Sequence, residues 1–478
     1  MTENYWSKEK SDSDLDPLNS LLSELSDPEV AEEEFREDFF QGLAGRRRKA
    51  AFVLTTVWLT IIALHLVSWG IWLVYGFTSL AGMQILRSLL AKADPIPPAL
   101  SDERLENVPK VSLLVAAKNE EIVISNLVAM LCSLDYPADK YEVWAIDDRS
   151  TDNTPAILDR LAQEYPQLKV VHRAANAGGG KSGALNQVIP QTFGDIIGVF
   201  DADAKVSADL LRRVVPLFDN EKMGAVQVRK EIANQSENFW TKGQATEMAL
   251  DSYVQQQRIA VGGIGELRGN GQFVSRTALH SCGGWNEETI TDDLDLTVRL
   301  HLDSWKIGFL LTPPVLEEGV TKAGSLWHQR NRWAEGGYQR YLDYWRYIFR
   351  TPMGFGKRID LLCWMLLQYI VPAANVPDGI MAISRHRLPI LSPVTALLFA
   401  WGFWSMFQGL LRIQKTTKDS IGVADLFVIA GQSLRGVIYM LHWQVVLFSV
   451  TARMSFRPKR LKWVKTVHGG NTSAASLK

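Results

Sequence analysis

The pattern of apolar and polar residues divides the chain into a central part of alternating short segments between two long apolar regions. Residues 1–45 are polar and acidic, which is typical of a disordered tail. Residues 46–92 begin with the basic run Arg46-Arg47-Arg48-Lys49 and continue with mostly apolar residues. Since one membrane-spanning helix needs ~20 residues, we expect two here, and one long tilted helix is the alternative. The basic run indicates that its near end is cytoplasmic.

A proline-rich linker at 93–109 leads to a part, residues 110–335, in which strand and helix patterns alternate. Its strands are short and apolar, as in a sheet that is covered on both faces. The expected strands cover 111–116, 142–146, 169–171 and 196–200, and the expected helices between them cover 120–134 and 151–165. This rhythm predicts an α/β fold with a mostly parallel sheet that binds ligands at the carboxyl ends of its strands.

Acidic side chains stand at those strand ends. Asp147 and Asp148 end the second strand, and Asp201 and Asp203 follow the fourth. Because residues two apart on an extended chain point the same way, Asp201 and Asp203 can converge on one divalent cation, which keeps positions open for a substrate phosphate. For this pair taken alone, a strand followed by an Asp-rich turn is the plainer interpretation.

The segment Gly178-Gly179-Gly180-Lys181-Ser182 is similar to the phosphate-binding loop of ATPases. That loop needs a glycine five residues before its Gly-Lys pair, where this chain has Ala175. The segment also follows the third strand rather than the first. We therefore reject an ATPase site, while Lys181 remains a candidate contact for a phosphate or a nucleobase.

Two further motifs end the central part. Asp292 and Asp293 lie at the head of a predicted helix, where carboxylates are commonly partners of the helix dipole. The run Trp327 to Trp333 is dense in hydrogen-bond donors and aromatic rings. A solvated basic helix face does not usually need two tryptophans, so this run is a candidate binding segment.

The last part of the chain has the pattern of a membrane protein. Residues 336–358 place Tyr338, Tyr341, Trp345 and Phe349 at helical spacing among arginines, which predicts an amphipathic helix in the membrane interface. Apolar segments at 360–383, 390–411 and 421–451 predict transmembrane or interfacial helices across 359–451, with two, three or four crossings. The basic tail 452–478 is cytoplasmic by the positive-inside rule.

Composition narrows the function classes. A formal net charge of −1 over 478 residues gives no reason to expect a nucleic-acid partner. The three cysteines, Cys132, Cys282 and Cys363, are too far apart for a CxxC metal site and too few for a disulfide framework. The 16 tryptophans fit a water-soluble part combined with a part that faces lipid.

Together the motifs resemble those of the family 2 membrane glycosyltransferases, which include cellulose, chitin and hyaluronan synthases. In order, they are Ala117-Lys118-Asn119-Glu120-Glu121, Asp147 to Asp152, Lys181 to Asn186, Asp201-Ala202-Asp203, Thr291-Asp292-Asp293 and Gln329 to Trp333. The resemblance covers roughly 110–335. It implies a GT-A catalytic domain, Rossmann-like with a mostly parallel sheet, flanked by α-helical transmembrane segments.

The resemblance also implies roles for the residues at the nucleotide end of the site. Asp147 and Asp148 would hold the uridine of the donor. Ala117 and Glu120 would lie in the same pocket, and Lys181 would lie near the nucleotide.

At the reacting end, the resemblance implies that Asp201 and Asp203 bind a metal, Mg²⁺ or Mn²⁺, on the diphosphate. Asp293 would be the general base that takes a proton from the acceptor hydroxyl, with attack inverting the sugar. Many relatives have Thr-Glu-Asp where this chain has Thr291-Asp292-Asp293, so Asp292 is the alternative candidate for the general base. The residues that would hold the donor and leaving group are Gln329, Arg332 and Trp333.

The resemblance further implies the substrates of the reaction and the location of the protein in the cell. It implies UDP-glucose as donor, 1,2-diacylglycerol as acceptor, and a multi-pass protein whose catalytic domain faces the cytoplasm, at a cyanobacterial thylakoid or plasma membrane. A processive polysaccharide synthase is the alternative, but the Cys-Gly acceptor motif of those enzymes is missing, since Cys282 lies too far along the chain. A non-catalytic transporter or scaffold is the third hypothesis.

Overall fold

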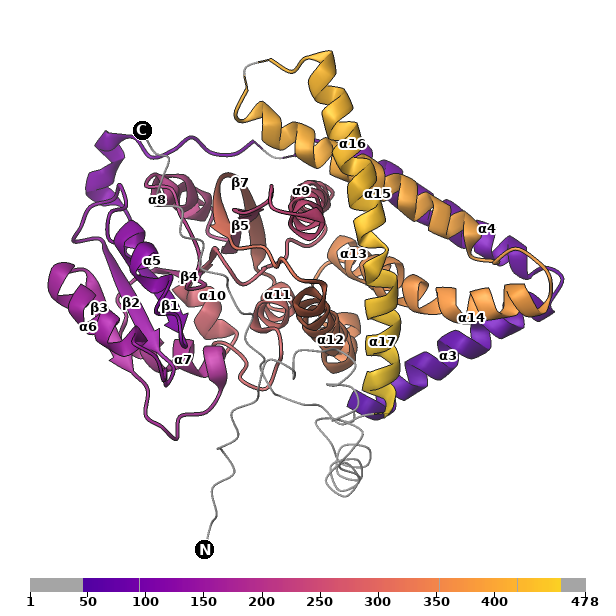
Figure 1. The fold of residues 1–478 in the computed structure, drawn as a ribbon, viewed down its shortest axis with the longest axis horizontal. Coiled ribbons are helices and arrows are strands. Elements are labelled where there is room, and N and C mark those ends of the chain that lie inside the picture. The colour runs from indigo at the N-terminus through magenta and orange to yellow at the C-terminus, as the bar shows by residue number, and fades with distance from the viewer. Residues whose placement is uncertain (1–45, 94, 352, 419, 457–478) are drawn as a thin grey trace, which may run out of the picture.

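The computed structural model describes residues 46–93, 95–351, 353–418 and 420–456. In these ranges the chain forms an α/β part and a helical part that lie side by side (Figure 1). The expected acidic tail 1–45 and residues 457–478 of the expected basic tail lie outside the described residues. Arg453, which the sequence pattern places in that tail, belongs instead to the helix α17 (His442–Phe456).

One sheet forms the base of the α/β part. Its strands are β1 (Val111–Ala117), β2 (Tyr141–Asp147), β3 (Leu168–His172), β4 (Ile196–Phe200), β5 (Met223–Ile232), β6 (Gln272–Ser275) and β7 (Lys306–Glu317). The strand order is β3-β2-β1-β4-β6-β5-β7, and only β6 runs antiparallel to its neighbours. The mostly parallel sheet is confirmed, with β1 to β4 at the expected places, whereas the sequence pattern did not predict β5, β6 and β7.

The register of the parallel strands brings the expected site residues to one edge. Ala117 pairs with Asp147 at the ends of β1 and β2. Val115 pairs with Phe200, the last residue of β4, so Asp201 follows at the level of Ala116. The carboxyl ends of these strands therefore form one continuous rim.

Helices of the α/β part pack around the sheet. They are α5 (Ile124–Leu131), α6 (Thr154–Glu164), α7 (Gly180–Val188), α8 (Leu210–Val214), α9 (Phe239–Ala260), α10 (Arg276–Ser281) and α11 (Asp292–Leu302), with short 3-10 turns at Asp102–Asn107, Ile189–Gln191 and Val215–Asp219. One core joins Leu113 and Val115 of β1 to Leu127 of α5, and another joins Leu114 to Leu185 of α7. Alternate residues of β1 supply both cores because they point to opposite faces.

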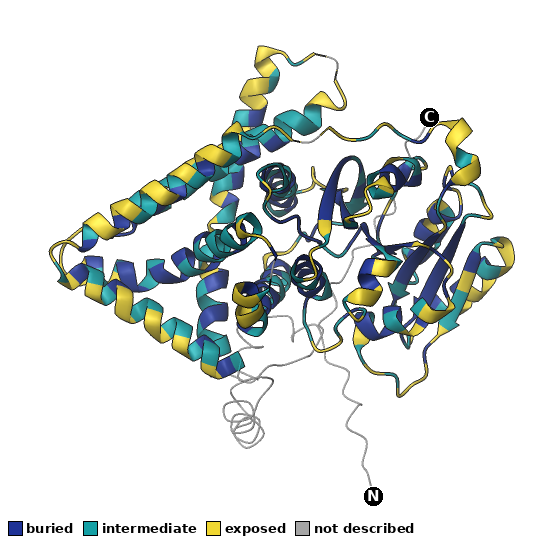
Figure 2. Cartoon of the chain, turned by 180° about the vertical axis from the view of Figure 1, so that it is seen from behind, coloured by how far each residue is buried: buried dark blue, intermediate teal, exposed yellow. Residues whose placement is uncertain are grey.

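Within the described ranges, five helical segments are long and apolar enough to cross a membrane. They are α3 (Arg46–Leu66), α4 (Gly70–Leu90), the segment Phe355–Ser384, α15 (Ser392–Lys415) and the segment Val423–Phe456. The third is made of α13 (Phe355–Met365), a π-helical turn (Leu366–Ile370) and α14 (Val371–Ser384), and the fifth of α16 (Val423–Met440) and α17. Phe52, Trp72 and Phe427 are exposed on these helices, and Figure 2 shows exposed residues along their length. A lipid environment would cover such surface.

One long helix connects the two parts and corrects a predicted boundary. α12 (Ala323–Arg350) contains both the motif Gln329 to Trp333 and the first half of the expected interfacial helix at 336–358. Tyr338 and Tyr341 are buried against Tyr369, whereas Trp345 is exposed. The helical spacing is confirmed, but the first aromatic residues fill the core between α12 and the membrane helices rather than facing lipid.

Candidate active site

Buried polar residues gather at the ends of β1 and β2. The backbone N–H of Asp148 donates to the carbonyl of Ala117 at 2.8 Å. A carboxylate oxygen of Asp147 accepts the N–H of Ser150 at 2.9 Å, which fixes the turn after the strand. The N–H of Glu120 donates to Thr154 in the first turn of α6. The structure therefore brings Ala117, Glu120, Asp147 and Asp148 to one rim of the sheet.

Arg173 connects the residues of this rim to another segment, although the sequence pattern did not predict its role. Its guanidinium lies 2.6 Å from a carboxylate oxygen of Asp148 and donates to the carbonyls of Gly178 and Gly180 at 2.5 and 3.2 Å. The Arg173 side chain thus connects Asp148 to the glycine segment. One sequence feature could have indicated this role. Arg173 follows β3 directly, and residues that follow the parallel strands lie at the same rim as the carboxylates.

The glycine segment presents Lys181 to the metal-candidate aspartates. Gly179 and Gly180 have φ of 78° and 52°, a region that favours glycine, at the start of α7. Lys181 Nζ lies 2.5 Å from Asp201 Oδ1. Burial lowers the pKa of Lys181, but Asp201 and Asp292 outweigh it, so the net pKa is raised and the ammonium stays charged.

The two aspartates after β4 are held by different parts of the chain. The N–H of Asp201 donates to Asn270 Oδ1 at 3.2 Å, and Asp203 Oδ2 accepts the N–H of Glu318 at 3.1 Å. Burial raises the pKa of Asp201, but Lys181, Lys230 and Arg332 outweigh it and hold that pKa below its usual value. An ionised carboxylate is the form that binds a hard divalent cation.

Asp293 is a half-buried acid in the first turn of α11. Burial, and next the charge of Asp292, raise its pKa to about 6, against the opposing influence of the Leu294 N–H, which donates to it at 2.8 Å. One carboxylate oxygen of Asp292 is buried without a hydrogen-bond partner in the part of the chain that the structure describes. The buried oxygen of Asp292 is therefore more than a helix cap, because desolvation of a carboxylate oxygen that has no partner destabilises the fold.

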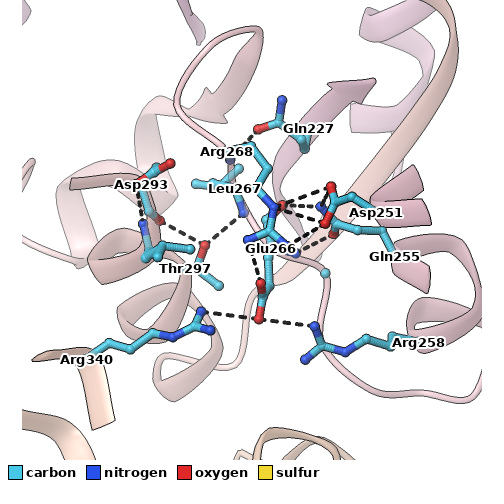
Figure 3. A network of polar contacts seen from close by, with 12 residues as sticks. Gln227, Asp251, Gln255, Arg258, Glu266, Leu267, Arg268, Asp293, Thr297 and Arg340 are labelled. Atoms are coloured by element: carbon cyan, nitrogen blue, oxygen red, sulfur yellow. Dashed lines mark hydrogen bonds and ion pairs between the residues drawn. The ribbon is translucent and has the colours of Figure 1, made fainter. Parts of the chain in front are cut away.

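The loop before β6 is fixed beside Asp293 by buried ion pairs (Figure 3). Glu266 is fully buried between guanidinium groups, with Nη1 of Arg258, Arg268 and Arg340 at 3.1, 2.7 and 3.2 Å. Gly269 follows with φ of 79°, and a Cβ there would come 3.3 Å from Asp293 Oδ2. The glycine therefore permits a close approach of this loop to the acid.

The α12 motif faces the same region and is held by Arg330. Arg330 donates to Gln329 Oε1 at 3.0 Å and lies 4.0 Å from the ring centroid of Trp333. Burial lowers the pKa of Arg332, and the charges of Asp201 and Asp293 oppose that decrease, so the guanidinium lies within electrostatic range of both aspartates. The α12 motif is therefore near the candidate metal ligands and the candidate base.

Arg330 also joins the motif to the membrane helices. Its guanidinium lies 2.5 Å from Glu247 of α9 and 3.2 Å from the hydroxyl of Tyr439 in α16. Trp443 of α17 donates its indole N–H to Glu247 at 2.8 Å. This cluster was not predicted, because its members lie on four helices and come from three distant parts of the sequence.

The fold and site define a class of enzyme. Carboxylates and cations converge at the carboxyl edge of a mostly parallel sheet, as in enzymes that bind nucleotides there. An acid with a raised pKa and an aromatic motif lie near the same edge, as a transferase requires for a donor and an acceptor. The geometry is therefore that of a transferase that uses a nucleotide-bound substrate.

Comparisons with known proteins narrow the class. Residues 109–336 match the family described as glycosyltransferase like family 2. The chain is 58% identical over 465 residues to the β-monoglucosyldiacylglycerol synthase of Synechocystis sp., covering 97% of each chain. It is 59% identical to the protein of the same name from Trichormus variabilis, covering 98% of this chain and 100% of the relative.

Among solved structures, the mannosyltransferase PcManGT from Pyrobaculum calidifontis, in complex with GDP-Man and Mn²⁺, matches with a TM-score of 0.51 at 20% identity. That match covers 81% of this chain and 99% of the other, and it supports the fold. The chain belongs to the family 2 glycosyltransferases. The GT-A fold and an enzyme that uses a UDP-sugar, both implied by the sequence motifs, are confirmed.

Proposed function

We propose that this enzyme transfers glucose from UDP-glucose to the sn-3 hydroxyl of 1,2-diacylglycerol, which gives β-monoglucosyldiacylglycerol and UDP. The observation that carries the proposal is the 58% identity to a β-monoglucosyldiacylglycerol synthase over 97% of both chains. That match includes the membrane helices as well as the catalytic domain. A lipid acceptor would bind next to those helices.

Asp293 suits the role of general base in this transfer. A pKa of about 6 leaves its carboxyl mostly ionised at neutral pH, so it can accept a proton from the acceptor hydroxyl. If the hydroxyl attacks from the face opposite UDP, the anomeric centre inverts and an α-linked donor gives a β-glucoside.

A divalent metal, Mg²⁺ or Mn²⁺, fits the pair Asp201 and Asp203. Their carboxylates are hard oxygen ligands, and the described residues contain no group of three or more His, Cys, Asp or Glu side chains that could form an all-protein cage. Mg²⁺ commonly takes one or two carboxylates and completes its shell with substrate phosphates and water. When bound, such an ion neutralises charge on the diphosphate. Lys181 and Arg332 would share that task, and Asp147 and Asp148 would hold the uridine.

We propose a multi-pass membrane protein with its catalytic domain in the cytoplasm. The basic run Arg46-Arg47-Arg48-Lys49 at the start of α3 supports this orientation. The cyanobacterial relatives support a thylakoid or plasma membrane. Diacylglycerol would then reach α12 from the bilayer, beside the exposed Trp345.

One assay tests the proposal. Membranes that contain the protein receive labelled UDP-glucose, 1,2-diacylglycerol and Mg²⁺, and the products are separated by thin-layer chromatography. We expect one lipid-soluble glycolipid, which disappears in the variant Asp293→Ala. An insoluble polymer would identify a polysaccharide synthase, and no transfer would identify a non-catalytic protein, so either outcome contradicts the proposal.

A further inference from the structure

A buried ion pair lies beside the α12 motif and has no role in the site as described so far. Lys230, near the end of β5, places its Nζ 2.8 Å from Glu317 Oε2, at the end of β7. The two side chains are only 9% and 14% exposed. Lys230 Nζ also lies 5.4 Å from the ring centroid of Trp333.

Hydrogen bonds connect the neighbours of this pair to both metal-candidate aspartates. Glu318, the next residue after Glu317, donates its N–H to Asp203 at 3.1 Å. Asn270 accepts the N–H of Asp201 through Oδ1, and its Nδ2 lies 3.5 Å from Glu317 Oε2. The pair therefore lies next to the metal-candidate aspartates.

The ammonium of Lys230 is charged and only partly satisfied by the protein. Burial lowers its pKa, but Glu317, Asp201 and Asp293 outweigh burial, so the net pKa is raised. An ammonium has three N–H donors, and among the described residues Glu317 is its one ion-pair partner. Buried donors usually have partners, so the remaining donors of Lys230 are available to a ligand bound beside it.

The chemistry of the pair favours a neutral ligand with hydroxyl groups. Because Lys230 and Glu317 neutralise each other, they offer a donor and an acceptor without net charge, beside the ring of Trp333. A diphosphate needs net positive charge, which Arg332 and a divalent ion supply. A sugar needs paired donors and acceptors for its hydroxyls and an apolar surface for its ring.

We propose that Lys230 and Glu317 bind hydroxyl groups of the donor sugar and so determine which sugar the enzyme transfers. This inference rests on the proposed function and assigns sugar choice to two residues that no sequence motif identified. A site built to hydrogen-bond a substrate hydroxyl rejects an analogue that lacks it, because buried polar groups then lose their partner.

The chain offers a matched control on the same strand. Arg229 is also buried, pairs with Glu231 at 2.7 Å and donates to the carbonyl of Leu311 at 2.9 Å. In the described part of the chain, its hydrogen bonds and its ion pair go to Leu311 and Glu231, neither of which is a site residue. Arg229→Met therefore removes a comparable ion pair from β5 and leaves the Lys230–Glu317 pair in place.

The test compares the wild type, Lys230→Met, Glu317→Gln and Arg229→Met, each purified and reconstituted in vesicles with diacylglycerol. The donors are UDP-glucose, UDP-galactose and UDP-glucose analogues that each lack one hydroxyl. For every donor, kcat/KM is measured, together with inhibition by UDP. The UDP measurement reports whether the nucleotide site is folded and whether the diphosphate is still bound.

In the wild type and in Arg229→Met, we expect at least one deoxy analogue to be disfavoured by about 10- to 100-fold. In Lys230→Met, the penalty on that same analogue should fall to within about threefold of UDP-glucose, while inhibition by UDP is unchanged. Unchanged penalties, or a loss of UDP inhibition in Lys230→Met but not in Arg229→Met, would overturn the inference. Failure of the wild type to glucosylate diacylglycerol would instead contradict the proposed function.

Discussion

The pH dependence of transfer reports on Asp293 directly. Its pKa of about 6 is raised by burial first and by Asp292 second. A general base works only when ionised, so kcat/KM should fall as the pH drops through the pKa. Roughly nine tenths of this carboxyl is ionised at pH 7 and roughly one tenth at pH 5, so the rate should fall about tenfold between them.

The variant Asp292→Asn separates the two causes of the raised pKa of Asp293, which are burial and the charge of Asp292. Removing the neighbouring negative charge makes it easier to ionise Asp293, so the acidic limb of the profile should move to lower pH. Asp303→Asn, at the other end of α11, makes the same charge change away from the site and should leave the limb in place.

The assay measures transfer from labelled UDP-glucose to diacylglycerol in vesicles between pH 5 and 8. An acidic limb that stays in place in Asp292→Asn would refute the electrostatic reasoning. If Asp292→Asn is inactive at every pH while Asp293→Asn keeps activity, then Asp292 is the base and our assignment is wrong.

Three further predictions concern the donor, the metal and the fold. Arg173→Leu should raise the KM for UDP-glucose more than it lowers kcat, because Asp148 and the glycine segment lose their shared partner; an unchanged KM would contradict this role. Asp203→Asn should lower kcat by about 10²-fold or more and weaken the dependence on added Mg²⁺, and a variant that keeps its metal dependence would exclude Asp203 as a ligand. Glu247→Leu leaves Arg330 buried without its carboxylate and should destabilise the protein by ~3–5 kcal/mol, as measured by thermal unfolding in detergent; Glu164→Gln, which removes the partner of the exposed Arg160, should cost far less.

The first half of the sheet was predictable because its signals are local. β1 to β4 are short apolar runs, and each of the acidic pairs follows such a run directly. The last three strands lack that signal. β5 carries Arg229, Lys230 and Glu231 within ten residues, and β6 has four residues and inserts antiparallel between β4 and β5. Their positions depend on long-range pairing.

The same distinction holds in the site. Asp147, Asp201 and Asp293 belong to short motifs that can be recognised along the sequence. The roles of Arg173 and Lys230 depend on their ion-pair partners Asp148 and Glu317, which only the fold places next to them. The extent of α12 was missed for a related reason, because helical aromatic spacing does not distinguish a core-facing stripe from a lipid-facing one.

The configuration of the product tests the central claim most directly. The purified enzyme, in vesicles of diacylglycerol and carrier lipid, is supplied with UDP-glucose, whose glucose is α-linked, and the glycolipid is analysed by NMR at its anomeric proton. Single inversion assisted by Asp293 predicts one glucose in β-linkage to the sn-3 oxygen of diacylglycerol. An α-linked product, or glucose joined to glucose in a chain, would contradict the account.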